Sequence, residues 1–193
     1  MLTRSPPSRD LLLEPESKPQ EQVFRQDLAV GASAKEILKG LLESSGYTVY
    51  PFGYEGSMSA LKREMAEKGF ANTPLVHRIR SMPDFLVSGD GKLQMIEVKF
   101  RSKRDNKGQP SVLLRNWEVG RYMEFWPESI LVLISNHEHR FYAKHVRDFV
   151  LGSYDQTWFQ YTDFYPLPDI FPRTAGKLES FQRGVDKLVG LWK

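Results

Sequence analysis

Two acidic residues and a lysine occur in the middle of the sequence at a spacing that could support metal-dependent chemistry. Asp84 precedes Glu97, and Lys99 follows two positions later. The segment between the two acids is rich in apolar residues and contains an Asp-Gly pair at positions 90–91, which favours a tight turn between antiparallel strands. The pattern predicts a β-hairpin over residues 84–100.

The register of this hairpin decides which side chains meet. With the two turn residues as the loop, Asp84 lies directly opposite Glu97, and their Cβ atoms are about 4.5–5.5 Å apart on one face. Lys99 shares that face because side chains alternate along a strand. The other face collects five apolar residues, which opposes a slip in register by one residue. It consists of Phe85, Val87, Ile96, Val98 and Phe100.

Two adjacent carboxylates repel each other unless a cation compensates their charge. Lys99 supplies part of that compensation, and a divalent metal ion would supply more. Oxygen ligands with no histidine or cysteine nearby favour Mg²⁺ or Mn²⁺, which can bind a phosphate oxygen and activate water. Lys99 would then orient the water or offset transition-state charge. The simpler interpretation is an exposed cross-strand ion-pair cluster that contributes little energy.

These residues resemble the signature of a known family. Pro83-Asp84 together with Glu97-Val98-Lys99 is similar to the motif of the PD-(D/E)xK nuclease superfamily, whose members have the restriction-endonuclease-like fold. The resemblance implies that Asp84 and Glu97 bind the metal. It also implies that Val98 adds a backbone carbonyl ligand and that Lys99 assists catalysis.

The resemblance extends upstream to a predicted helix over residues 33–45. Many members carry an acidic residue on their first helix, and Glu36 fits that position. A capping box that Glu36 would form with Ser33 explains the same residue without catalysis. Glu55 is a rival for the acidic role.

The remainder of the chain is predicted to form one domain behind an arm. Residues 1–27 are rich in Pro, Ser, Glu and Gln and are expected to be flexible, whereas residues 28–193 form a nuclease-like α/β domain with a mixed central sheet flanked by helices. The order of elements resembles the family core over residues 33–135, with residues 53–82 as an insertion. Predicted helices cover residues 33–45, 57–68, 116–125, 145–151 and 175–191, and predicted strands cover 47–52, 84–88, 93–100 and 130–135.

Cations on both sides of the motif are candidates to bind a phosphate backbone. The formal net charge of +3 is modest, so their distribution along the chain is the stronger signal. For the cations before the motif, in residues 77–80, the alternative interpretation is an ordinary solvated loop. The candidates are Arg78, Arg80, Arg101, Lys103, Arg104 and Lys107.

Two further groups invite a functional interpretation that the sequence does not favour. His137 and His139 have spacing that suits zinc, but they follow a buried strand in what is predicted to be a surface turn. The aromatic residues between positions 154 and 172 could stack on bases, although a core or partner interface is the preferred interpretation. They include Trp158, Phe159, Tyr161, Phe164 and Tyr165.

Composition excludes several classes of site. The absence of cysteine excludes disulfides, iron–sulfur clusters, cysteine-ligated zinc and thiol catalysis. No apolar run approaches the length of a membrane span, and the N-terminus lacks a signal peptide. The sequence therefore predicts a cytoplasmic protein that has no membrane partner.

The combined features predict a Mg²⁺- or Mn²⁺-dependent deoxyribonuclease that acts in DNA recombination, repair, transposition or restriction. DNA is the expected substrate, without exclusion of RNA, and an endonuclease is favoured. A homodimer or a larger DNA-processing complex is the expected assembly. Resolvase, restriction and transposition or repair activities all stay open, although the insertion and the long C-terminal region lean away from a compact resolvase. The alternative is a catalytically silent DNA-binding or assembly module with the same fold.

Overall fold

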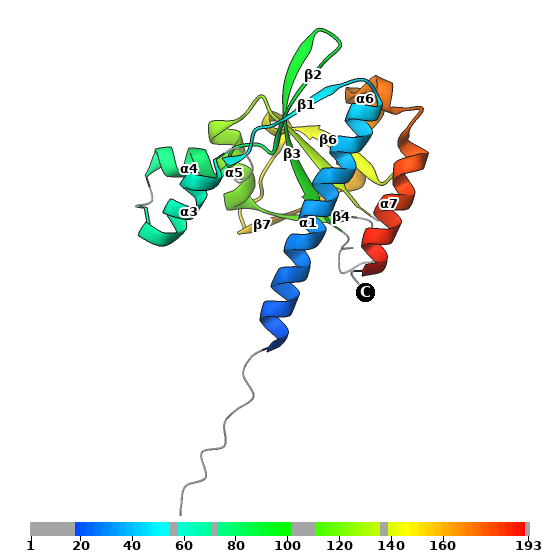
Figure 1. Cartoon of the computed structure of the whole chain (residues 1–193). Coiled ribbons are helices and arrows are strands. Elements are labelled where there is room, and N and C mark those ends of the chain that lie inside the picture. The colour runs from blue at the N-terminus through cyan, green and yellow to red at the C-terminus, as the bar shows by residue number, and fades with distance from the viewer. Residues whose placement is uncertain (1–17, 55–57, 71–72, 102–110, 136–138, 192–193) are drawn as a thin grey trace, which may run out of the picture.

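A computed structural model describes residues 18–54, 58–70, 73–101, 111–135 and 139–191 of the chain (Figure 1). Its centre is a six-stranded sheet in the order β1-β2-β3-β5-β6-β8, and β4 and β7 form a separate two-stranded ribbon. The strands are β1 (Thr48–Pro51), β2 (Phe85–Gly89), β3 (Lys92–Phe100), β4 (Ser111–Arg115), β5 (Ile130–Ile134), β6 (Phe141–His145), β7 (Gln156–Gln160) and β8 (Tyr165–Pro166). The α-helices are α1 (Lys18–Ser44), α3 (Ser59–Lys68), α4 (Pro74–Arg80), α5 (Asn116–Phe125), α6 (Leu167–Ile170) and α7 (Leu178–Leu191).

Strand β5 separates two hydrophobic cores because its successive side chains point to opposite faces of the sheet. Ile130, Val132 and Ile134 pack in the core formed with α1 and α7, whereas Leu131 and Leu133 pack in the core formed with α5 and the β4–β7 ribbon. All five are buried, as expected for a strand that is covered on both faces. The protein is therefore a mixed α/β domain whose central sheet is flanked by helices, which confirms the predicted fold class.

The sheet is mixed because β3 pairs in parallel with β5 and antiparallel with β2. Helix α1 runs along one face of the sheet beside α7, and α5 lies on the opposite side with the ribbon (Figure 1). Helices α3 and α4 form a small lobe beyond α5. None of the described helices is long and apolar enough to cross a membrane.

The hairpin forms in the predicted register. Phe85 pairs with Ile96 and Gly89 with Lys92, which makes positions 90–91 the two-residue loop. Both loop residues have positive φ, 52° at Asp90 and 70° at Gly91, as a tight hairpin turn requires.

The turn is anchored by side chains from distant parts of the chain. The Tyr47 hydroxyl donates to Asp90 Oδ2 at 2.8 Å, and Arg173 Nη2 lies 2.6 Å from Asp90 Oδ1. The Arg173 guanidinium also lies over the Tyr47 ring, 5.4 Å from its centre. The hairpin is thus held at its tip as well as along its apolar face.

Helix α1 begins at Lys18, so the predicted start at residue 33 is wrong. The sequence from residue 18 onward has Pro19 in the first turn, where proline is tolerated, and then no further proline before residue 51. Ser33 lies inside the helix, where its hydroxyl donates to the Ala29 carbonyl at 2.9 Å. The capping-box explanation of Glu36 is therefore also wrong. Residues 1–17 of the predicted arm lie outside the described residues.

Two other predictions of local structure fail because of capping and sheet pairing. Residues 77–80 belong to α4 rather than a loop, because Pro74 starts the helix and the Thr73 side chain accepts a hydrogen bond from Val76 N at 3.3 Å. The helix predicted over residues 145–151 is instead the end of β6 and a short 3₁₀ turn over Val146–Asp148. The helices predicted over 57–68, 116–125 and 175–191 are confirmed, as are the four predicted strands.

The packing of Tyr47 against the hairpin gives a test of this arrangement. A Cβ atom at Gly89 would lie 2.2 Å from Tyr47 Cδ1, inside a ring that Asp90 and Phe171 hold in place. We expect Gly89→Ala to lower the free energy of unfolding by about 1–3 kcal/mol in urea denaturation. Gly176→Ala is the matched control, because no atom lies within 4 Å of its added Cβ. Equal effects of the two substitutions would contradict the described packing.

Candidate active site

Asp84 lies at the point where β2 begins and is fixed by both its backbone and its side chain. Its carbonyl accepts the amide of Phe52 at 2.9 Å. One carboxylate oxygen, Oδ2, accepts the amide of Val98 at 2.9 Å, and the other, Oδ1, lies 2.5 Å from Lys35 Nζ of α1. The Asp84 side chain therefore ties the hairpin to the first helix.

Glu97 and Lys99 lie on β3 and face α5, which supplies two more polar groups. Lys99 Nζ lies 2.7 Å from Glu97 Oε1 and 2.6 Å from Glu118 Oε1. The Tyr122 hydroxyl donates to Glu97 Oε1 at 2.7 Å. Glu118 and Tyr122 are one helical turn apart, so they project from the same side of α5.

Burial and charge set the protonation behaviour of this group. Desolvation raises the pKa of Glu97 to about 7, with Lys99 opposing the rise and Asp84 adding to it. Burial alone would lower the pKa of Lys99, but the adjacent carboxylates hold it well above its usual value. Burial raises the pKa of Glu118, yet Lys99 outweighs this effect and leaves it below its usual value. Burial and Glu97 raise the pKa of the Tyr122 hydroxyl, so it stays a hydrogen-bond donor.

Two clefts meet at this polar cluster. The first has a volume of about 870 Å³, and Asp84, Glu97 and Lys99 line it together with Glu36 and Arg80. The second has a volume of about 680 Å³ and lies toward the β4–β7 ribbon. Residues common to both are Lys35, Glu97, Lys99 and Glu118. The Glu97 and Glu118 carboxylates thus border both clefts, whereas Asp84 borders only the first.

The oxygen atoms of the cluster fit a hard divalent cation. Among the described residues, both hydrogen-bonding partners of Glu97 use Oε1, which leaves Oε2 available as a ligand. The Val98 amide points to Asp84, and because the N–H and C=O of a strand residue point to the same side, the Val98 carbonyl faces that side too. In the described part of the chain, no three acidic, histidine or cysteine side chains are placed so that they could hold one metal ion together. A cation here would have few protein ligands, as Mg²⁺ commonly does.

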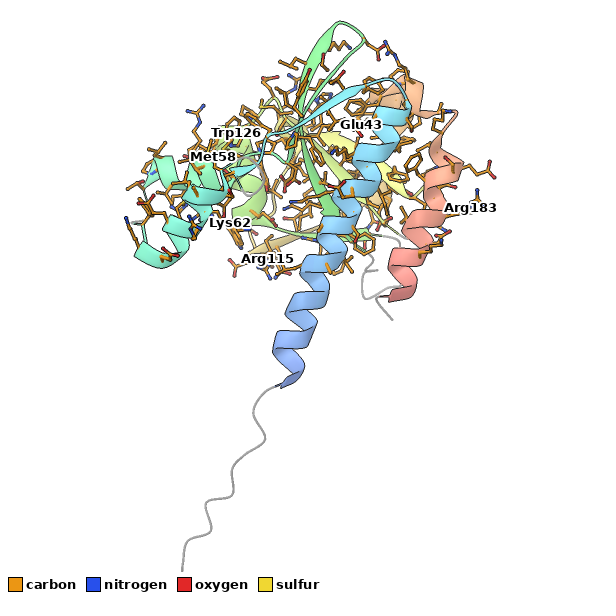
Figure 2. The ribbon with its side chains drawn as sticks, viewed as in Figure 1. Glu43, Met58, Lys62, Arg115, Trp126 and Arg183 are labelled. Carbon is orange, nitrogen blue, oxygen red and sulfur yellow. The ribbon has the colours of Figure 1, made fainter. Side chains whose placement is uncertain are left out.

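The structure brings together the three residues of the predicted motif, and Glu36 lines the same cleft. Of the predicted phosphate-binding cations, Arg80 lines the first cleft and Arg101 the second. Arg78 instead packs over the Trp126 ring, 5.3 Å from its centre, where α4 meets the end of α5 (Figure 2). Lys103, Arg104, Lys107 and the rival acid Glu55 lie outside the described residues.

Sequence reasoning missed Lys35, Glu118 and Tyr122. Glu118 and Tyr122 could have been found from the sequence. They form a polar pair spaced by one turn on a correctly predicted helix, next to buried Val119. No sequence pattern pointed to Lys35, because its proximity to Asp84 depends on how α1 crosses the end of the hairpin.

The histidine and aromatic groups singled out from the sequence divide into exposed and buried members. His139 is exposed, and its ring contacts Tyr142 at a centroid distance of 5.8 Å, while His137 lies outside the described residues. Phe159, Tyr161 and Phe164 are buried in the core beneath α5, as preferred from the sequence. Trp158 and Tyr165 are the exposed members of the set.

Comparison with known proteins gives limited information. No family model matches the sequence, and no curated protein matches it. Among solved structures, the chain is similar to Hjc, a Holliday junction resolvase from the archaeal hyperthermophile Archaeoglobus fulgidus, with a TM-score of 0.45 and 15% sequence identity over 72% of this chain and 98% of that chain. Similarity at this level carries no argument about function, which rests instead on the geometry of the site.

The raised pKa of Glu97 predicts a specific dependence of stability on pH. Between its ordinary value of 4.5 and about 7, the folded protein keeps a proton on Glu97 that the unfolded chain has lost. The contribution of this group to the free energy of unfolding therefore falls as pH rises, by up to about 1.4 kcal/mol per pH unit. We expect Glu97→Gln, compared with the wild-type protein by urea denaturation in EDTA, to become relatively more stable between about pH 5 and pH 8. A difference that does not change with pH would contradict the burial of this carboxyl.

Proposed function

We propose that this protein is a metal-dependent nuclease that hydrolyses phosphodiester bonds of DNA. The observation that carries the proposal is the adjacency of two carboxylates, Asp84 and Glu97, in an open cleft beside the ammonium group of Lys99. An ordinary surface ion-pair cluster would be exposed, whereas the Glu97 and Lys99 side chains are only 6% and 16% exposed. Burial of such a cluster is costly and is most often found at functional sites.

Asp84, Glu97 and the Val98 carbonyl would hold the metal, which supplies Lewis-acid activation of a phosphate oxygen and of water when bound. Lys99 is proposed to orient the attacking water and to offset the negative charge that develops on the phosphate. Hydrolysis forms a bond from the water oxygen to phosphorus and breaks one phosphorus–oxygen bond of the backbone.

Three further residues are proposed to position these groups. Glu118 holds Lys99 Nζ at 2.6 Å, and Tyr122 holds Glu97 Oε1 at 2.7 Å, so both fix the side chains that face the substrate. Lys35 balances the charge of Asp84 at 2.5 Å, and it lies close enough to the centre to contact a bound phosphate. Glu36 of the same helix remains a candidate for a second acidic group.

The charge around the centre suits a polyanionic substrate. Arg80 and Lys39 line the first cleft, and Arg101 and Arg115 line the second, so cations flank the carboxylates on both sides. A phosphate backbone that passes over the centre would meet cations before and after the scissile bond. The proposed role is in DNA recombination, repair, transposition or restriction, all of which require cutting of DNA, and a dimer would supply the two sites needed to cut both strands.

Cleavage is the direct test of the proposal. We expect the protein to cut at least one of supercoiled plasmid, linear duplex, single strand or four-way junction with Mg²⁺ or Mn²⁺, and not in EDTA. Asp84→Asn and Lys99→Ala are expected to reduce the rate by at least about 100-fold, because they remove a metal ligand and the charge-offsetting group.

Exposed Lys62 lies on α3 and outside both clefts, so Lys62→Ala is the matched control for loss of a lysine (Figure 2). No cutting of any substrate, combined with DNA binding that does not depend on metal, would favour the catalytically silent binding module. If the protein cuts only RNA, the proposed hydrolysis of phosphodiester bonds would stand, but the proposed substrate would be RNA instead of DNA.

The positioning role of Tyr122 predicts a smaller and more specific effect. Tyr122→Phe keeps the ring but removes the hydrogen bond to Glu97, so the carboxylate is less well oriented. We expect metal affinity or activity to fall about 10- to 100-fold, measured by titrating Mn²⁺ against the cleavage rate.

Tyr142→Phe is the matched control, since Tyr142 is buried in the same core as Tyr122 but lines neither cleft. Equal losses in the two variants would show that the effect reflects stability alone.

A further inference from the structure

The second cleft has features that the hydrolysis reaction does not require. It leads from Glu97 and Lys99 to the start of α5 and to the β4–β7 ribbon. Trp117, at the beginning of α5, lines this cleft and is 53% exposed, although large aromatic side chains are usually buried. It directly precedes Glu118, the residue that holds Lys99. An exposed indole therefore lies next to the proposed catalytic centre.

Trp117 has one face in contact with a cation and is placed to offer the other to a ligand. The Arg121 guanidinium lies over the ring at 5.0 Å from its centre, which fixes the indole against its own helix. A rigid aromatic surface beside a site for phosphate chemistry suits the stacking of a nucleobase.

The ribbon extends this surface away from the centre. Leu113 lies directly opposite Trp158, and Arg115 directly opposite Gln156, so these four side chains share one face of the β4–β7 ribbon. Their neighbours Val112, Leu114 and Phe159 are buried on the other face. Leu113, Arg115 and Gln156 line the cleft, and exposed Trp158 continues the same face.

Positive charge accompanies this aromatic surface. Arg101 and Arg115 both line the second cleft together with Glu118, and their charge contributes to the lowered pKa of that carboxyl. Alternation of a stacking surface with cations is the pattern by which proteins hold a single nucleic-acid strand. A duplex cannot use the indole in this way, because its bases are already stacked and present only their edges.

We infer that the second cleft binds unpaired nucleotides next to the scissile phosphate, with Trp117 stacked on a base and Arg115 on the backbone. The inference rests on the proposed nuclease function and adds the substrate class, a strand that is single or unpaired on one side of the cut. Trp158 provides a second stacking position farther along the ribbon.

Binding without metal tests this inference separately from cleavage. We would measure fluorescence anisotropy of a labelled single strand of about 16 nucleotides, and of the matching duplex, in EDTA. Trp117→Ala is expected to weaken single-strand binding about 5- to 150-fold and duplex binding less than about twofold. Tyr165→Ala, which removes a 52% exposed aromatic at the far edge of the sheet, is expected to change neither.

An abasic scan identifies the stacked base. Removal of one base at a time from the single strand is expected to weaken wild-type binding at the position stacked on Trp117, and to have no further effect at that position in Trp117→Ala. Arg115→Gln is expected to reduce the dependence of log K on log salt by about 0.7, as for loss of one single-strand phosphate contact. Arg183→Gln on α7, on the other side of the sheet, is the charge control (Figure 2).

The outcomes separate the two proposals. Unchanged or equally reduced binding of single strand and duplex in a folded Trp117→Ala variant would overturn the inference, and the exposed indole would then belong to a protein interface. Cleavage that persists in that case would leave the nuclease proposal intact. If the protein binds single strands selectively but cuts no substrate, the proposed role of the second cleft would stand and the nuclease proposal would be overturned.

Discussion

Between Phe85 and Phe100, side chains alternate between an apolar face that is buried against α1 and a polar face that carries Glu97 and Lys99. A slip of one residue would bury both charges in that core and expose Ile96 and Val98, a cost that no local rearrangement could offset. The two-residue turn fixes the same register from the other end. The polar contacts within the hairpin follow from this constraint, including the bond from the Val98 amide to Asp84.

The register also brings charged side chains close together, and helices on both sides of the sheet supply residues of opposite charge to them. Helix α1 contributes Lys35 to Asp84, and α5 contributes Glu118 to Lys99. The result is two ion-paired sets, Lys35 with Asp84 and Lys99 with Glu97 and Glu118, so that each of these carboxylates has a lysine partner. Loss of one partner from such a buried set typically costs several kcal/mol, because the remaining charge is left uncompensated. Stability and chemistry therefore depend on the same residues.

The two clefts differ in composition although they share the centre. The first is bounded by α1, β1 and α4 and contains lysine and arginine side chains with an additional acid, Glu36. The second is bounded by α1, β4 and α5 and presents an indole and two guanidinium groups. Such asymmetry is expected if the substrate has a different structure on each side of the scissile bond. A uniform duplex has the same structure on both sides. The α3–α4 lobe, packed on α5 through Trp126, shapes only the first cleft (Figures 1 and 2).

The sequence by itself determined the hairpin, its register, the gathering of Asp84, Glu97 and Lys99 at one site, and the helix over residues 116–125. These depend on short-range alternation, turn chemistry and helical periodicity, which neighbouring residues encode directly. Composition was a poorer guide to residues 18–27, where α1 extends into the segment that was expected to be a flexible arm. Only the tertiary structure decided that Lys35, Glu118 and Tyr122 complete the site and that Trp117 stands beside it. Those contacts join elements far apart in the chain, and the angle at which two helices cross a sheet is set by the packing of whole cores.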